Sequence, residues 1–129
     1  MSIAVHVEDD LSGRWQKAVG QELTRAGFDP MSFGLASQAI AFLNDPTSGI
    51  FDNLGLVVVD GDLINPDPSM PDEKGQLVVD YLSERSWAGP IIEVSDGVSG
   101  RGKTSAKYYL GKSGFDNRDL RALLAGLQS

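Results

Sequence analysis

The sequence predicts an α/β fold, a doubly wound parallel sheet of five strands with helices on both faces. Short apolar runs rich in β-branched residues alternate with stretches whose apolar residues recur at helical spacing. Strands that alternate with helices form parallel sheets, and right-handed crossovers leave only a few topologies for them. The expected strands cover residues 3–7, 31–33, 54–59, 90–94 and 107–110.

The N-terminal half holds two of these strands and two predicted helices. The first strand stops at three consecutive acids, which begin a loop. Apolar residues then follow helical spacing over residues 11–26, and Gly27 ends that helix. After the short strand at 31–33, a second apolar stripe over 36–43 predicts another helix, which Pro46 ends.

The C-terminal half begins with the most apolar strand of the chain. Residues 54–59 are apolar without interruption, as in a strand buried on both faces of a parallel sheet. Residues 61–72 carry three prolines and several acids and are predicted to form a loop. A third helix is expected over 77–82. The final helix has an apolar face made of Leu120, Leu123, Leu124 and Leu127.

Length and composition favour a single globular domain over residues 1–129. The chain is 41% hydrophobic and 22% charged, which argues against disorder. Its formal charge of -7 argues against direct binding to nucleic acid. The sequence has no cysteine, no apolar run long enough for a membrane span and no signal peptide, so we expect a cytoplasmic protein.

Polar side chains follow four of the predicted strands. They are Glu8, Asp9, Asp60, Ser95 and Lys112. In a doubly wound sheet the carboxyl ends of the strands meet at one edge, so these groups are expected to converge. Three adjacent carboxylates repel unless a cation joins them, and oxygen ligands suit Mg²⁺. A carboxylate, a metal and nearby donors together suit phosphoryl transfer to the carboxylate.

Four motifs in this order resemble those of response-regulator receiver domains, the phosphorylated switches of two-component signalling. They are Val-Glu-Asp-Asp at 7–10, Val-Val-Val-Asp at 57–60, Ile-Ile-Glu-Val-Ser at 91–95 and Tyr-Leu-Gly-Lys at 109–112. The likeness covers essentially the whole chain and implies the flavodoxin-like receiver fold. It implies a stand-alone response regulator whose only catalysis is its own phosphorylation and dephosphorylation.

The resemblance also implies a role for each site residue. Asp60 would accept a phosphoryl group from a sensor histidine kinase or a histidine phosphotransfer protein. Mg²⁺ would be held by Glu8, Asp9, Asp60 and the backbone carbonyl of Asp62. Lys112 would contact the phosphoryl oxygens, and Ser95 would move towards them while Tyr109 turns inward. The output would be contact with a downstream protein or onward phosphotransfer.

Several positions depart from the receiver pattern. Ser113 stands where a proline usually follows the lysine, and Asp96 replaces a small residue. The usual Met-Pro and Gly after the acceptor correspond to Met70-Pro71 and Gly75, displaced by an insertion rich in Pro and Asp. The stretch between Ser95 and Tyr109 is short and glycine-rich, which predicts a shortened or absent fourth helix.

Two alternatives remain open from the sequence. A pseudo-receiver would keep the fold and act as a protein-interaction module without phosphorylation. A nucleotide-binding protein is the other, since residues 97–104 match the phosphate-binding pattern G-x-x-x-x-G-K-[ST]. That motif needs a long helix directly after Thr104, whereas the sequence predicts a strand at 107–110.

Overall fold

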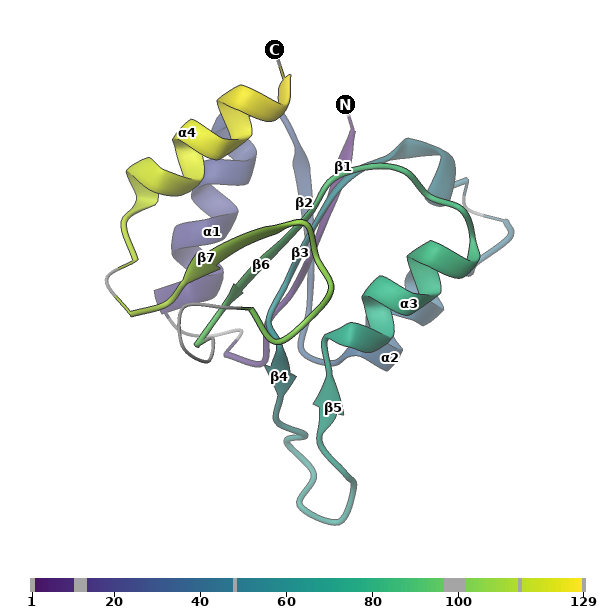
Figure 1. Cartoon of the computed structure of the whole chain (residues 1–129). Coiled ribbons are helices and arrows are strands. Elements are labelled where there is room, and N and C mark those ends of the chain that lie inside the picture. Colours follow the sequence, from purple (N-terminus) through teal and green to yellow (C-terminus); the bar gives the residue numbers. More distant parts are fainter. Residues whose placement is uncertain (1, 11–13, 48, 97–101, 114, 129) are drawn as a thin grey trace.

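The computed structural model describes residues 2–10, 14–47, 49–96, 102–113 and 115–128. Its centre is a five-stranded sheet in which every neighbouring pair is parallel, in the order β2-β1-β3-β6-β7 (Figure 1). The strands are β1 (Ile3–Val7), β2 (Asp29–Phe33), β3 (Leu54–Val59), β6 (Ile91–Ser95) and β7 (Tyr108–Gly111). The five-stranded parallel sheet predicted from the sequence is therefore confirmed.

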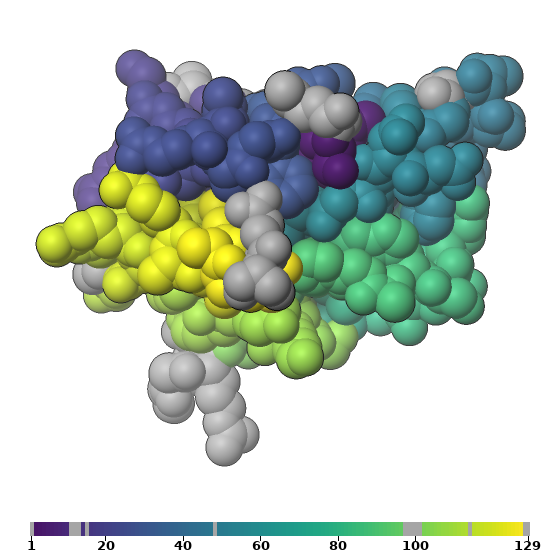
Figure 2. All heavy atoms as spheres, turned by 90° about the horizontal axis from the view of Figure 1, so that it is seen from above, coloured from purple at the N-terminus to yellow at the C-terminus, as the bar shows by residue number. Residues whose placement is uncertain are grey.

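Helices cover both faces of this sheet (Figure 1). On one face lie α1 (Arg14–Arg25) and α4 (Asn117–Gln128), and on the other α2 (Ala36–Leu43) and α3 (Gln76–Glu84). Seen from the end that holds both termini, α4 lies against α1, while α3 lies beside the segment that follows α2 (Figure 2). That segment contains the 3₁₀ turn η1 (Phe51–Asn53). Position 11, where the sequence predicts the first helix to begin, lies outside the described residues.

Two apolar cores result, one on each face of the sheet. Alternate residues of a strand point to opposite faces, so β3 supplies Val57 and Val59 to the core under α2 and α3. Its Leu56 and Val58 enter the core under α1 and α4. All four are fully buried, which explains why the sequence of β3 is uninterruptedly apolar.

The strand order places a crevice at the carboxyl ends of β1 and β3. The chain moves from β1 to β2 on one side and then returns to β3 on the other, so the winding reverses between β1 and β3. Helices cannot cover the sheet edge at such a reversal, and ligands of doubly wound proteins bind there. Any site made by residues that follow these strands therefore lies at this edge.

Residues 61–72 differ from the predicted loop, because part of the segment is paired. The two-residue strands β4 (Asp62–Leu63) and β5 (Glu73–Lys74) pair antiparallel. The hairpin they form projects beyond the sheet at the carboxyl ends of the strands (Figure 1). Two residues are too short a run to produce an alternating pattern, so the sequence carried no signal for this pairing.

The connection from β6 to β7 has no helix in its described part, residues 96 and 102–107. Residues 102–107 instead pack beside β6 and reach β7 in an irregular conformation. Within the described residues, no helix has the length and apolar character that a membrane crossing requires.

Candidate phosphoryl-acceptor site

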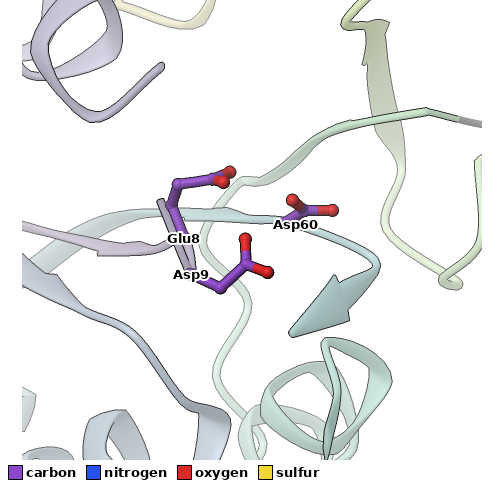
Figure 3. A group of neighbouring side chains, drawn as sticks. All are labelled: Glu8, Asp9 and Asp60. Carbon is purple, nitrogen blue, oxygen red and sulfur yellow. The ribbon is translucent and has the colours of Figure 1, made fainter. Parts of the chain in front are cut away.

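The three carboxylates predicted to meet do so at the edge of the sheet (Figure 3). Glu8, Asp9 and Asp60 each offer an oxygen, and these atoms all lie within 4.8 Å of one another. Backbone hydrogen bonds extend the parallel ladders one residue past the strands and fix this arrangement. The Glu8 amide donates to the Phe33 carbonyl, and the Asp60 amide donates to the Val7 carbonyl, each at 2.9 Å.

Lys112 joins two of these carboxylates. Its Nζ lies 2.7 Å from Asp60 Oδ2 and 2.9 Å from both carboxylate oxygens of Glu8. The Lys112 amide donates to the Ser95 carbonyl, so β7 continues along β6 and carries the lysine to the site. Burial lowers the pKa of Lys112, but its hydrogen bonds to Asp60 and Glu8 outweigh burial and raise the pKa above its usual value.

The pKa of Glu8 is strongly perturbed by its surroundings. Burial raises the pKa of Glu8 to about 8, and the negative charge of Asp60 adds to the increase although Lys112 opposes it. The side chain is almost inaccessible to water. Burial and the charge of Asp60 both disfavour the ionised form of Glu8, and a divalent cation bound to the cluster would favour it.

The β4–β5 hairpin contributes two backbone amides to the site, which the sequence did not predict. The Ile64 amide donates to Asp9 Oδ2 at 3.0 Å, and the Asp62 amide is 3.3 Å from Asp60 Oδ1. Backbone amides leave no mark in a sequence, so only the fold reveals that the insertion orients two of the carboxylates.

Ser95 and Tyr109 lie next to the site and contact each other. The Ser95 side chain is fully buried, and its hydroxyl donates to a carboxylate oxygen of Glu93. The Tyr109 hydroxyl donates to the Ser95 carbonyl at 3.3 Å, and the tyrosine is partly buried. The switch roles expected for both residues remain predictions.

The chain is similar to known proteins in structure but not in sequence. No family model matches the sequence, and no curated protein is significantly similar to it. A chain of the CheX–CheY–BeF3–Mg²⁺ complex from Borrelia burgdorferi matches with a TM-score of 0.72 and 18% identity, over 99% of this chain and 90% of that one. The signal receiver domain of an HD domain-containing protein from Pseudomonas fluorescens matches with a TM-score of 0.71 and 14% identity, over 98% and 94% of the two chains.

A third similar structure is the receiver domain of the Francisella response regulator 1452. Its TM-score is 0.69, with 17% identity over 98% of this chain and 96% of that one. The chain has the receiver fold. The predicted structural likeness to response-regulator receiver domains is confirmed across nearly the whole chain.

The glycine-rich segment of this receiver fold does not support the nucleotide-binding alternative. Residues 97–101 of the motif lie outside the described residues. In the rest of it, the amides of Lys103 and Thr104 donate to the Glu93 carboxylate at 2.7 and 2.8 Å. No helix follows in residues 105–107, and β7 begins at Tyr108. These amides hold a carboxylate of the chain itself, and the helix that a phosphate-binding loop requires is missing there.

His6, the only histidine of the chain, is buried in β1 beside the site. Its Nδ1 has no hydrogen-bond partner among the described residues. Burial, and secondarily the positive charge of Lys112, lower the pKa of His6 to about 4. The imidazole is therefore neutral at neutral pH and serves as packing.

The low pKa of His6 predicts a specific acid sensitivity. The pKa is about 4 in the folded chain and 6.5 without perturbation, so between these values only the unfolded chain binds the proton. The titration of His6 therefore lowers stability as pH falls from 6.5 towards 4, by roughly 2 kcal/mol at pH 5. Urea unfolding of wild type and His6→Leu at pH 7.5 and pH 5 measures this loss as a difference between the proteins. Glu8 titrates in both proteins, and parallel pH profiles would contradict the prediction.

Proposed function

We propose that the chain is a phosphorylation-dependent signalling switch that accepts a phosphoryl group on Asp60. The observation that carries this proposal is the convergence of Glu8, Asp9, Asp60 and Lys112 at the crevice of a receiver fold. The donor would be the phosphohistidine of a sensor kinase or of a phosphotransfer protein. The chain would act in two-component signalling in the cytoplasm and would catalyse only its own phosphorylation and dephosphorylation.

The donor set fits Mg²⁺. Glu8, Asp9 and Asp60 supply closely spaced carboxylate oxygens, which are the ligands that this ion prefers. Asp62, whose amide already contacts Asp60, would add its backbone carbonyl. When bound, the ion would neutralise negative charge on the carboxylates and on the incoming phosphoryl oxygens.

Each of the other side chains at the site would have a separate role in phosphorylation. A carboxylate oxygen of Asp60 would form the bond to phosphorus while the bond from phosphorus to the histidine nitrogen breaks. Lys112 contacts Asp60 directly, so its ammonium is placed to donate to the transferred group. Ser95 would leave Glu93 to donate a hydrogen bond to the phosphoryl group. Tyr109, bonded to the Ser95 carbonyl, would follow that movement and change the surface offered to partners.

The partners in this proposal are proteins. The solved complex of CheX and CheY with BeF3 and Mg²⁺ is one of the structures similar to this chain, and it supports protein contact as the output. A BeF3-activated DrrB receiver domain is similar as well, with a TM-score of 0.67 and 20% identity. Contact with a downstream protein or onward phosphotransfer would pass on the signal.

Incubation with acetyl phosphate tests the proposal. With Mg²⁺, intact-protein mass spectrometry should show one added phosphoryl group, in a linkage that hydroxylamine cleaves. With EDTA in place of Mg²⁺ the addition should fall to background, because the carboxylate cluster would then repel the anionic donor. An established receiver domain in the same buffer serves as positive control. If that control is labelled while this chain stays unmodified, the pseudo-receiver alternative is correct and the proposal fails.

A further inference from the structure

A buried carboxylate anchors residues 102–104 of the connection between β6 and β7. Glu93 lies in the middle of β6, and its side chain is almost fully buried. It accepts hydrogen bonds from the amides of Lys103 and Thr104, from the Thr104 hydroxyl at 2.7 Å and from the Ser95 hydroxyl. Burial alone would raise the pKa of Glu93, but these hydrogen bonds lower it below its usual value. Glu93 is therefore a charged anchor whose oxygens are satisfied by one short segment and one serine.

The anchored segment approaches too closely for any larger residue at one position. A Cβ atom added to Gly102 would lie 2.6 Å from Glu93 Oε1, which is closer than real Cβ atoms come. A side chain at this position would have to push the Glu93 carboxylate out of its hydrogen bonds, which favours glycine there. The hydrogen bonds and this contact together fix the backbone of Lys103 next to the phosphoryl-acceptor strand β3.

The side chain of Lys103 then extends across the residue that follows the acceptor. A Cβ atom added to Gly61 would lie 2.7 Å from the Lys103 Cβ and 3.1 Å from its Cδ, so the aliphatic stem covers Gly61 directly. The Lys103 ammonium ends on Asp62 Oδ2. The Lys103 side chain is only 30% exposed, so its ammonium has little freedom to move. Lys74, which contacts the other oxygen of the Asp62 carboxylate, has a side chain that is 73% exposed.

We propose that Lys103 is a second phosphoryl-binding cation of the site, and that Glu93 is the residue that positions it. This inference rests on the proposed function, because it concerns the group that Asp60 would carry. Lys103 comes from the connection between β6 and β7, whereas Lys112 follows the end of β7. The negative charge of Asp60 also raises the pKa of Lys103, after the larger effect of its hydrogen bond to Asp62.

The labelling reaction needs no reactant other than acetyl phosphate. An Asp60 oxygen bonds to the phosphorus of acetyl phosphate, the bond from phosphorus to the acetate oxygen breaks, and acetate leaves with that electron pair. No proton is transferred, and Lys103 remains an ammonium throughout. An ammonium has three N–H donors, so Lys103 can keep its bond to Asp62 while it donates another to a phosphoryl oxygen.

Lys103→Met tests the cation, with Lys74→Met as its matched control. Both variants remove one ammonium from the Asp62 carboxylate, but only Lys103 extends across Gly61. Lys103→Met should slow labelling by acetyl phosphate about tenfold, the effect of one charge-assisted hydrogen bond, whereas Lys74→Met should label at the wild-type rate. Lys103→Arg should recover part of the loss. The affinity for beryllofluoride in the presence of Mg²⁺, measured by isothermal titration calorimetry, should also fall in Lys103→Met and stay unchanged in Lys74→Met.

The outcomes separate this inference from the proposed function. If wild type is labelled and Lys103→Met matches Lys74→Met in rate and in beryllofluoride affinity, Lys103 has no such role although Asp60 is the acceptor. If wild type itself is not labelled and does not bind beryllofluoride, the proposed function fails first.

Glu93→Gln tests the positioning role. It should slow labelling to the level of Lys103→Met, and the double variant should lose little more, because both changes remove the same contact. Thr104→Val removes the hydroxyl contact to Glu93 and the oxygen that accepts the Ala106 amide, while it keeps the backbone contacts to Glu93. It should give a smaller loss in the same direction and serves if Glu93→Gln does not fold. Additive losses in the double variant, or a full wild-type rate in both Glu93→Gln and Thr104→Val, would overturn the positioning role.

Discussion

Asp60→Asn is expected to abolish phosphoryl uptake from acetyl phosphate completely. An amide is not a nucleophile for phosphorus, and no other group of the site combines the position of Asp60 with its contacts. The Asp60 carboxylate follows the central strand β3, accepts the Lys112 ammonium at 2.7 Å and shares the acidic cluster with Glu8 and Asp9. Asparagine keeps the size of the side chain, so the fold should be preserved, which far-ultraviolet circular dichroism checks.

Asp52→Asn is the matched control for this experiment. Asp52 is an exposed carboxylate in η1, outside the acidic cluster, and its removal should leave the extent of labelling unchanged. Mass spectrometry of both variants beside wild type gives the comparison. A full phosphoryl mass on Asp60→Asn would move the acceptor to another carboxylate and refute the assignment.

The site residues that could be predicted from the sequence are those that directly follow a strand. A strand leaves a strong pattern when it is buried on both faces, as β3 is, and the residue after it must lie at the sheet edge. Because parallel strands end on the same edge of a sheet, the order of the elements alone predicts that Asp60, Glu8, Asp9 and Lys112 lie together.

The parts that could not be predicted depend on backbone groups and on single buried polar residues. The Ile64 amide on Asp9 has no sequence signal, since every residue except proline has such an amide. Glu93 looks like an interruption of an apolar strand, and only the structure shows four hydrogen bonds that make its burial favourable. The Gly-Lys-Thr sequence at 102–104 suggested phosphate as the bound anion, whereas its amides bind the carboxylate of Glu93.

Gly75 lies many residues after Asp60 in the sequence but directly beside it in the structure. The β4–β5 hairpin leaves the sheet after Asp60 and returns at Gly75, whose amide donates to the Gly61 carbonyl at 3.0 Å. A Cβ atom at Gly75 would lie 2.0 Å from the Asp60 carbonyl oxygen and 2.8 Å from Val59 Cγ2. The two ends of the insertion therefore lie side by side, and Gly75 packs directly on Asp60.

Gly75→Ala is therefore expected to destabilise the fold by about 3 kcal/mol, or about 10 °C in Tm. Both obstructing atoms belong to β3 or its end, and neither is the tip of a flexible side chain, so the backbone of Asp60 or the start of α3 must move. Gly20→Ala is the control, because a Cβ there meets nothing within 4 Å and alanine favours the helix α1. It should stabilise the chain by about 0.5–1 kcal/mol. Thermal and urea unfolding measure both.

Labelling by acetyl phosphate in the folded fraction of Gly75→Ala tests whether this contact also matters for the site. Relief of the clash by movement of Asp60 would shift its carboxylate relative to Lys112 and slow labelling, whereas movement of α3 alone would lower stability and leave the rate intact. If Gly75→Ala were as stable as wild type, the close packing of the hairpin's end on Asp60 would be wrong. In that case the hairpin would not position Asp60.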